Sequence, residues 1–350
     1  TMSSKGPLET NTGGMGPVTN NTYGYFASGR TSPGDWTTEI QRIQYSNDTS
    51  ASVVKGNVGW PAGGQGIGGV GNMDYGYFGG GATAAPATVS TVDRLDYSND
   101  ILNASIRGPL SVVRKGQGVA TGNLSFGYWC AGQTPSTTST VDRVDYGNDT
   151  ATASARGNLS GAQKGLGATG NTSYGYFGGG ASPKMSTVNR VDYADDTATA
   201  VVKGPLSYSD EGISATGNAS YGYFMGGPSL TTVSRIDYAD DTSTALTKGP
   251  LAAAKWYGAA TGNSSYGYIA GNTPGSSLMD RLDYSSDTTT AAAKGPLSAA
   301  RYGMGAAGNA SYGYFGGGRS GPSRYTTAEV EVTIPAAPEN LIFPSLLVSN

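Results

Sequence analysis

Five arginines each stand two residues before an aspartate, and these pairs are the first candidates for chemistry in the chain. They are Arg94 with Asp96, Arg143 with Asp145, Arg190 with Asp192, Arg235 with Asp237 and Arg281 with Asp283. Residues two apart on a β-strand share a face, so each pair predicts either a structural ion pair or an acid site of the sialidase or glycosidase type. An active site is seldom repeated five times. We therefore interpret the pairs as structural, forming ion pairs within each repeat and bonds across its strands.

Other catalytic groups are scarce. The chain has no histidine and a single cysteine, Cys130, which excludes Ser-His-Asp and Cys-His catalysis and zinc sites built on histidine. Cys130 stands where related segments carry glycine or alanine, which favours packing over a nucleophilic role. The turns "SNDT" and "ADDT" lack the oxygen-rich loop of an EF-hand and are expected to be Asx turns. We expect no enzymatic activity, no cofactor and no metal.

A Tyr-Gly-Tyr phrase recurs through the chain and sets a repeat. Its seven copies begin at Tyr23, Tyr75, Phe126, Tyr174, Tyr221, Tyr266 and Tyr312, at spacings of 45 to 52 residues. Other phrases keep the same period, among them "DRVDY" at 142–146, "SNDT" at 46–49 and "KGPL" at 203–206. A period of this length is typical of a propeller, a solenoid or an array.

Each repeat divides into four short segments. In one copy they read "GLGATGN" (165–171), "SYGYFGGG" (173–180), "STVNRVDY" (186–193) and "TATAVVKGPL" (197–206). They end at Gly, Asn, Asp or Pro and lack helical periodicity, so we expect four strands per repeat, as in a propeller blade. Small residues in the first strand suit the crowded axis. In the second strand the glycine opposite the tyrosines is expected to give the neighbouring blade a slot for an aromatic ring.

The sequence therefore predicts an all-β fold, a seven-bladed β-propeller with four-stranded antiparallel blades over residues 1–335. The last copy lacks a fourth segment, whereas "TMSSKGPL" at 1–8 is a fourth segment without the three that should precede it. We expect residues near 1–4 to pair with residues near 326–332, so that the N-terminal strand closes the last blade. Residues 336–350 depart from the repeat and are expected to form a tail that docks on the propeller or joins copies into a homo-oligomer.

At these residues the chain resembles kelch-type β-propellers, in which an aromatic strand ends in a glycine doublet and a Tyr-Asp strand and turn follow. The doublets are Gly79–Gly80, Gly178–Gly179, Gly226–Gly227 and Gly316–Gly317, with Ala131–Gly132 and Ala270–Gly271 in two further copies. The kelch tryptophan of the fourth strand is absent. The wording from the Tyr-Gly-Tyr phrase to "KGPLS" is also similar to repeat proteins of tailed marine bacteriophages, which implies a structural protein of a virion.

The composition limits the classes of partner that we expect. Charged residues make up 13% of the chain, the net charge is −3, and Gly accounts for 56 of 350 residues. No basic field is present to hold nucleic acid, and no apolar run is long enough to span a membrane. We expect a non-enzymatic structural or adhesion protein of a virion or the extracellular space, with protein partners or a surface glycan. The alternative is a propeller that binds or cleaves carbohydrate.

The connections between segments two and three, and from segment four to the next repeat, vary in length and wording, whereas the other turns are nearly uniform. In a blade of alternating strands these variable connections leave on the same face. Binding on a rigid scaffold usually uses variable loops, so we place the partner surface there. The candidate contacts are Arg30, Trp36, Trp60, Lys184, Tyr208, Trp256, Tyr257, Arg319, Arg324 and Tyr325. Packing within the loops is the competing interpretation of these side chains.

Overall fold

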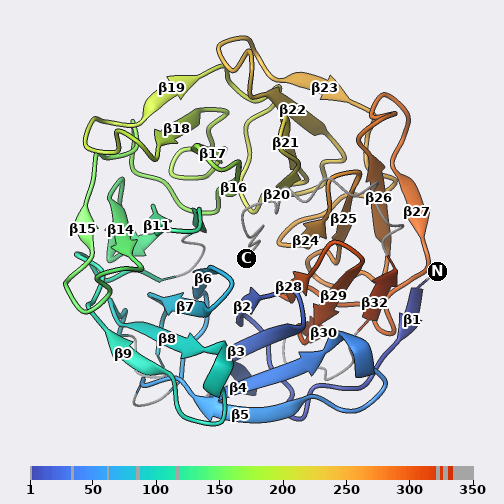
Figure 1. Ribbon diagram of the computed structural model, residues 1–350. Helices are drawn as coiled ribbons and strands as arrows, with labels where there is room; N and C mark the ends of the chain where they lie inside the picture. Colours follow the sequence, from blue (N-terminus) through green and yellow to red (C-terminus); the bar gives the residue numbers. More distant parts are fainter. Residues whose placement is uncertain are drawn as a thin grey trace.

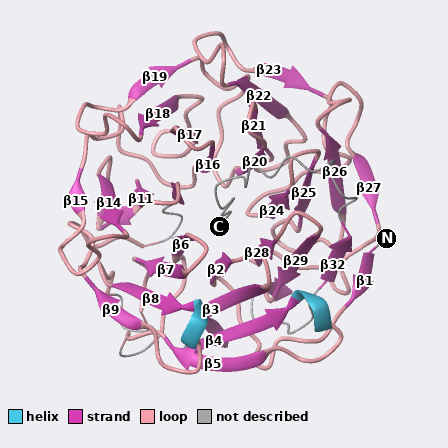
Figure 2. Cartoon of the chain, in the orientation of Figure 1, coloured by secondary structure: helices cyan, strands magenta, loops and turns pink. Residues whose placement is uncertain are grey.

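The computed structural model describes residues 2–32, 35–60, 63–83, 87–115, 119–320, 324–325 and 330–333. Short antiparallel sheets stand side by side in a closed ring around a central axis (Figures 1 and 2). The described strands make seven four-stranded sheets, and each sheet contains one copy of the Tyr-Gly-Tyr phrase. The chain is therefore a β-propeller, and we number its blades from the N-terminus, starting with the blade that contains β2.

The four strands of a blade follow one another from the axis to the circumference. The innermost strands are β2 (Gly16–Thr19), β6 (Gly68–Gly71), β10 (Val119–Gly122), β16 (Gly167–Gly170), β20 (Ser214–Gly217), β24 (Ala259–Gly262) and β28 (Gly305–Gly308). The second strands, which carry the Tyr-Gly-Tyr phrase, are β3 (Tyr23–Ser32), β7 (Tyr75–Gly79), β11 (Phe126–Cys130), β17 (Tyr174–Gly178), β21 (Tyr221–Met225), β25 (Tyr266–Ala270) and β29 (Tyr312–Gly316).

The third strands are β4 (Asp35–Gln44), β8 (Val92–Asp96), β14 (Val141–Asp145), β18 (Val188–Asp192), β22 (Val233–Asp237), β26 (Met279–Asp283) and β32 (Val330–Thr333). The outer strands are β5 (Val53–Asn57), β9 (Ser105–Arg107), β15 (Ser154–Ala155), β19 (Val201–Lys203), β23 (Leu246–Lys248), β27 (Ala292–Lys294) and β1 (Met2–Ser4). Two loop hairpins, β12 (Gln133–Thr134) with β13 (Ser136–Thr137) and β30 (Arg319–Ser320) with β31 (Arg324–Tyr325), and two 3₁₀ turns, η1 (Tyr45–Asn47) and η2 (Tyr97–Asn99), complete the described elements.

The last blade contains both ends of the described chain. Its strand order is β28, β29, β32 and β1, and β1 is antiparallel to β32, with Met2 opposite Val332 and Ser4 opposite Val330. Figure 1 shows β1 at the circumference beside β32, at the place that β27 takes in the preceding blade. Residues 334–350 lie outside the described residues, and so does the tail expected at 336–350.

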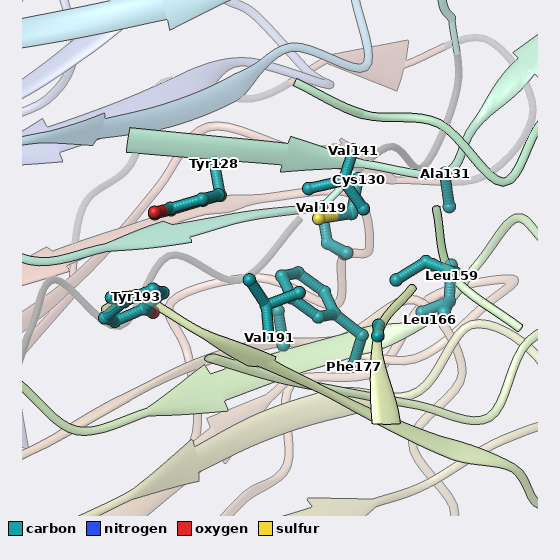
Figure 3. Packing of buried hydrophobic residues seen from close by; sticks show 12 residues of the cluster. Val119, Tyr128, Cys130, Ala131, Val141, Leu159, Leu166, Phe177, Val191 and Tyr193 are labelled. Carbon is teal, nitrogen blue, oxygen red and sulfur yellow. The ribbon is translucent and has the colours of Figure 1, made fainter. Parts of the chain in front are cut away.

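Blades pack through the two faces of the second strand. In six of the seven phrases the second tyrosine points to the following blade, where its ring stacks on the tyrosine that follows the third strand, as Tyr128 does on Tyr193 with centroids 4.9 Å apart. The ring after that tyrosine points to the preceding blade, as Phe177 does (Figure 3). Cys130 and Val141 of one blade meet Phe177 and Val191 of the next in a single buried cluster. Hydrophobic cores therefore lie between the blades.

The expected slot beside the Tyr-Gly-Tyr glycine exists, but a residue of the same blade fills it. A Cβ on Gly222 would lie 2.8 Å from the hydroxyl of Tyr238, in its own blade, and 2.8 Å from Cγ2 of Thr169, in the preceding blade. The neighbouring blade instead presses its ring on the first glycine of the doublet, since a Cβ on Gly178 would lie 2.8 Å from Phe224. The prediction of a slot for the neighbour's ring was wrong at the first glycine.

Replacing Gly222 by alanine is expected to lower the free energy of unfolding by about 1–3 kcal/mol, because the new methyl overpacks the joint against Tyr238 and Thr169. The matched control is Gly161→Ala, whose Cβ would have its nearest neighbour at 3.8 Å. Denaturant unfolding of both variants checks the difference. Equal stabilities would contradict the packing described here.

Candidate functional site

Acidic side chains gather with cations at the joints between blades. The acid is the last aspartate of the turn after the third strand, as in "SNDT" at 46–49 and "ADDT" at 194–197, and it stands four residues after the residue that pairs with the first aromatic residue of the phrase. The preceding blade supplies a tyrosine from its second strand, an arginine from its third and a lysine or arginine from its fourth. The described joints of this kind are centred on Asp100, Asp149, Asp196, Asp241 and Asp287. Asp48 accepts a hydrogen bond from Tyr314 and pairs with Lys5, but the residue opposite Tyr314 is Glu331 in place of the arginine.

The joint at Asp241 shows the geometry. Its Oδ2 accepts hydrogen bonds from the Tyr176 hydroxyl at 2.7 Å and from the Arg190 guanidinium at 2.8 Å. Its Oδ1 lies 2.9 Å from Nζ of Lys203. Tyr176 is paired with Arg190 across β17 and β18, so the sheet register brings the two donors side by side. The guanidinium also lies over the ring of Tyr174, 4.3 Å from its centroid, which adds a cation–π contact.

These contacts keep the acid charged. Burial alone would raise the pKa of Asp241, but the bonds from Lys203 and Tyr176 and the charge of Arg190 hold it below its usual value. Burial, together with the bond to Asp241, raises the pKa of Tyr176, so this hydroxyl stays a donor. A carboxylate with a lowered pKa and two cationic partners is a poor general acid. The joint is suited to holding blades together.

The repeated Arg-x-Asp pairs do not form the ion pairs predicted within each repeat. Arg190 reaches across to Asp241 of the next blade and leaves Asp192 to cap its own turn, where Oδ1 accepts the Ala194 N–H at 2.9 Å. The Asx turn therefore belongs to this aspartate, and the turn aspartate that we expected to be self-bonded makes the joint. The fixed four-residue offset between the two aspartates was a signal that sequence reasoning did not use.

A second set of polar residues is buried opposite the packed ring. Asp93, Asp142 and Asp280 occupy one register position in three blades, and none of the three is exposed. Asp142 pairs with Arg114, and Asp280 lies 2.8 Å from Nζ of Lys255. Asp93 has no such cation among the described residues. Its Oδ1 accepts the Gly59 N–H at 2.9 Å, and its Oδ2 has no hydrogen-bond partner there.

Burial raises the pKa of Asp93 to about 6, and the Gly59 N–H and the nearby Trp60 indole oppose that shift only in part. Perturbed carboxyls often mark functional sites. Asp93, however, is closed off from solvent, and Asn189 takes the equivalent position in another blade and accepts the Ser160 N–H at 2.8 Å. Asp93 thus ties a loop to the third strand, as its counterparts do.

The aromatic candidates of the variable-loop face differ in burial. Trp60 is 2% exposed and packs among core residues, so it is an internal residue of its loop. Tyr208 is half-buried against a core cluster. Trp256 and Tyr257 are half-buried and stack on each other, with centroids 5.1 Å apart. Trp36 is half-buried on the long hairpin of β3 and β4.

The charged candidates contact neighbouring loops. Arg30 lies over the ring of Trp36, 5.6 Å from its centroid, and Arg319 lies over the ring of Tyr302, at 5.8 Å. The side chain of Lys184 is 52% exposed and pairs with Asp210 from the loop that follows its blade. Arg324 and Tyr325 form β31, which pairs with β30, and their side chains lie outside the described residues. The binding role of all ten residues stays a prediction.

Beneath these loops a chain of backbone hydrogen bonds links successive blades. Each donor and acceptor stands two residues before the innermost strand of its blade. The N–H groups donate to the preceding carbonyl from Gly66 to Gly14, Gly14 to Gly303, Gly303 to Tyr257, Tyr257 to Gly212 and Gly212 to Gly165, at 2.9 to 3.2 Å. All six residues have positive φ, from 53° to 75°. Glycine adopts this conformation without strain, which explains why it recurs here and makes Tyr257 the exception.

Replacing Gly303 by alanine is expected to lower the free energy of unfolding by about 1 kcal/mol, the usual cost of a left-handed residue with a Cβ. Its φ is +62°, and a Cβ there would meet nothing within 4 Å, so backbone strain is isolated from packing. Thermal melting compares it with Gly161→Ala, which carries no such strain. An unchanged melting temperature in Gly303→Ala would contradict the strained geometry.

Within the described ranges, no group of three or more acidic or cysteine side chains is placed to hold a metal ion. No helix in that part of the chain is long and apolar enough to cross a membrane. Cys130 is fully buried, and burial raises the pKa of its thiol well above the usual value, in keeping with a packing residue.

Comparison with known proteins adds no relative. No protein-family model matches the chain, and no curated protein matches it. The likeness to kelch repeats therefore extends to the propeller arrangement of the blades, and the likeness to bacteriophage proteins has no support from these comparisons. The assignment of the chain therefore depends on its own architecture. It is a β-propeller of Tyr/Gly-rich blades that are joined by tyrosine, arginine and aspartate side chains.

Proposed function

We propose that this protein is a non-enzymatic structural or adhesion protein of a virion or the extracellular space, which binds a protein or a surface glycan through its variable-loop face. One observation carries the proposal. The variable connections of successive blades pair with one another by backbone bridges, such as Val89 with Arg114, Lys115 with Gln133 and Thr138 with Gln163. The loops therefore make one continuous layer, in which aromatic and charged side chains are held in place.

The opposite face supports this assignment by contrast. Its turns repeat one arrangement, in which an asparagine side chain accepts two N–H bonds of its own turn, as Asn218 does from Ser220 and Tyr221 at 2.9 Å. The amide of Asn218 then donates to Ser264 of the next blade at 3.2 Å. A surface built from one repeated bond pattern offers little specificity, whereas the loop layer differs from blade to blade.

The aromatic side chains of the variable-loop face favour a glycan as the ligand. Trp36 beside Arg30, and the stacked pair Trp256 and Tyr257, present flat rings with polar neighbours in loops. Rings of this kind are enriched at binding surfaces because they bury a large area and keep a polar edge. A carbohydrate-cleaving propeller would need a free acid pair, and the recurring carboxylates of the blades are engaged in joints and turns.

A glycan array, followed by incubation with the polysaccharides that bind, tests the proposal. We expect binding without chain cleavage, and at least tenfold weaker binding in Trp36→Ala and Lys184→Ala, which change two loops of the variable face. The matched control is Leu124→Ser, a change of a 64% exposed residue in a turn of the uniform face, which should bind normally. Polysaccharide cleavage would favour the enzymatic alternative, and equal loss in Leu124→Ser would contradict the choice of face.

A further inference from the structure

Among the described residues, one joint has the cations of the other joints but no acid. In the sixth blade, Tyr268 pairs with Arg281 across β25 and β26, and Lys294 pairs with Met279 across β26 and β27. The fifth blade places Tyr223, Arg235 and Lys248 in the same registers, and there they hold Asp287. The two sets of donors are thus equivalent in position.

The acid that should follow is missing from the sequence at its register. In the other blades it stands four residues after the residue opposite the first tyrosine, as Asp287 follows Asp283. In the seventh blade Thr333 is opposite Tyr312, and four residues further the sequence has Ala337. Within the described part of the chain, no carboxylate pairs with Arg281 or Lys294, although both are only half-exposed.

The donors remain arranged for an anion. The guanidinium of Arg281 lies over the ring of Tyr266, 4.5 Å from its centroid, as Arg235 lies over Tyr221 at 4.3 Å. Its Nε is buried without a hydrogen-bond partner among the described residues, as that of Arg235 is at the filled joint, where Nη1 holds the acid. Tyr268 is 2% exposed, so its hydroxyl is fixed at the joint.

The nearby carboxylate of Asp283 does not replace the missing acid. It caps its own turn, where Oδ1 accepts the Ser285 N–H at 3.0 Å. Its counterpart in the fifth blade, Asp237, does the same for Ala239 while Arg235 and Lys248 hold Asp287. Two cations and one phenol therefore face a position that elsewhere contains a carboxylate.

We propose that Tyr268, Arg281 and Lys294 form a carboxylate-binding site at the joint between the sixth and seventh blades. The ligand is a carboxylate group that bridges the phenol, the guanidinium and the ammonium, as Asp287 does one blade earlier. It is supplied either by Glu339, two residues beyond the register of the missing acid, or by an acidic group of another molecule. Charge-assisted bonds of this kind are the stronger class of hydrogen bond.

Sodium formate is the probe, because it carries the carboxylate alone. Melting temperatures are measured from zero to 200 mM formate, with sodium chloride keeping the ionic strength constant, for the wild type, Glu339→Gln, Arg281→Gln and Lys294→Gln. A filled site stabilises the fold by mass action, and we expect formate to raise the melting temperature by about 1–2 °C where the site is empty. Arg281→Gln and Lys294→Gln should lose that response.

The group that supplies the carboxylate determines which protein shows a rise of the melting temperature in formate. If another molecule supplies it, the wild type and Glu339→Gln respond alike. If Glu339 occupies the site, the wild type does not respond, while Glu339→Gln melts lower than the wild type and is restored by formate. Arg235→Gln, which changes the same residue type at a filled joint, is the matched control: it should melt lower and keep the formate response of the wild type. The proposal is overturned if neither the wild type nor Glu339→Gln responds, or if the Arg281 and Lys294 variants respond equally.

Discussion

Replacing Lys255 by methionine is expected to lower the free energy of unfolding at pH 7.5 by about 3–5 kcal/mol, the range for removing one partner of a buried ion pair. Neither Lys255 nor Asp280 has exposed side-chain surface, and they lie 2.8 Å apart. Methionine keeps the length and the apolar stem of lysine. The decrease in the free energy of unfolding therefore measures the cost of leaving the Asp280 carboxylate without its cation.

The double variant Lys255→Met with Asp280→Asn completes the test. Asparagine at this register is natural, since Asn189 occupies it in the fourth blade. If the loss comes from the unpaired charge, the second substitution should recover most of it, and the coupling measured by denaturant unfolding should be at least 2 kcal/mol. Strictly additive effects would show that the two side chains are not coupled, and the buried pair described here would be wrong.

The second large effect concerns Asp93, whose substitution by asparagine is expected to stabilise the protein at pH 7.5 by about 2 kcal/mol. Burial raises the pKa of this carboxyl from 3.8 to about 6, a difference of roughly two units, or about 3 kcal/mol. The native state therefore binds more protons than the unfolded state between these values. Stability contributed by the protonated group is present below pH 4 and is lost as the pH rises through 6. Asparagine removes this penalty at the cost of an unpaired amide, as at Asn189.

Unfolding at pH 4.5, 5.5, 6.5 and 7.5 measures the effect as a gain that grows with pH. Asp142→Asn is the matched control, because this aspartate has the same register but pairs with buried Arg114. It should lose stability at every pH, since its loss leaves the guanidinium without a carboxylate. A gain in Asp93→Asn that is the same at pH 4.5 and 7.5 would contradict the titration of Asp93 as its cause.

The sequence predicted the blade and its strands because their signals are local. Tyr174 and Tyr176, two residues apart in a glycine-flanked strand, indicate one buried face by alternation alone, and the fixed period carries that assignment round the ring. The joints could not be predicted in the same way. Tyr176 and Asp241 are 65 residues apart and meet only when two blades stand side by side, so the local pair Arg190 and Asp192 suggested the wrong partner.

The burial of Trp60 could not be predicted for a related reason. Trp60 stands in a variable loop with Pro61, an environment typical of an exposed aromatic, yet it fills the space beneath Gly64 and Gly81, where a Cβ would come within 3.0 Å of the ring. Composition does not distinguish a loop that covers the core from one that faces solvent. Lys184, at 52% exposed, shows that the same loops also present polar groups outward.

The joints described above also give the ring a direction. Each of the first six blades offers its tyrosine and cations on one side and its aspartate on the other, as the fourth blade does with Arg190 toward Asp241 and Asp196 toward Arg143. In the language of assemblies this contact is heterologous, and such contacts make closed rings only when the rotation per unit closes. These six blades are therefore chemically compatible with one another as neighbours, whereas the seventh has Glu331 at the register of the joint arginine. The number of units is therefore set by the angle at which the blades pack, and excising one whole repeat from the second to the fifth blade would bring its two neighbours together with matching partners.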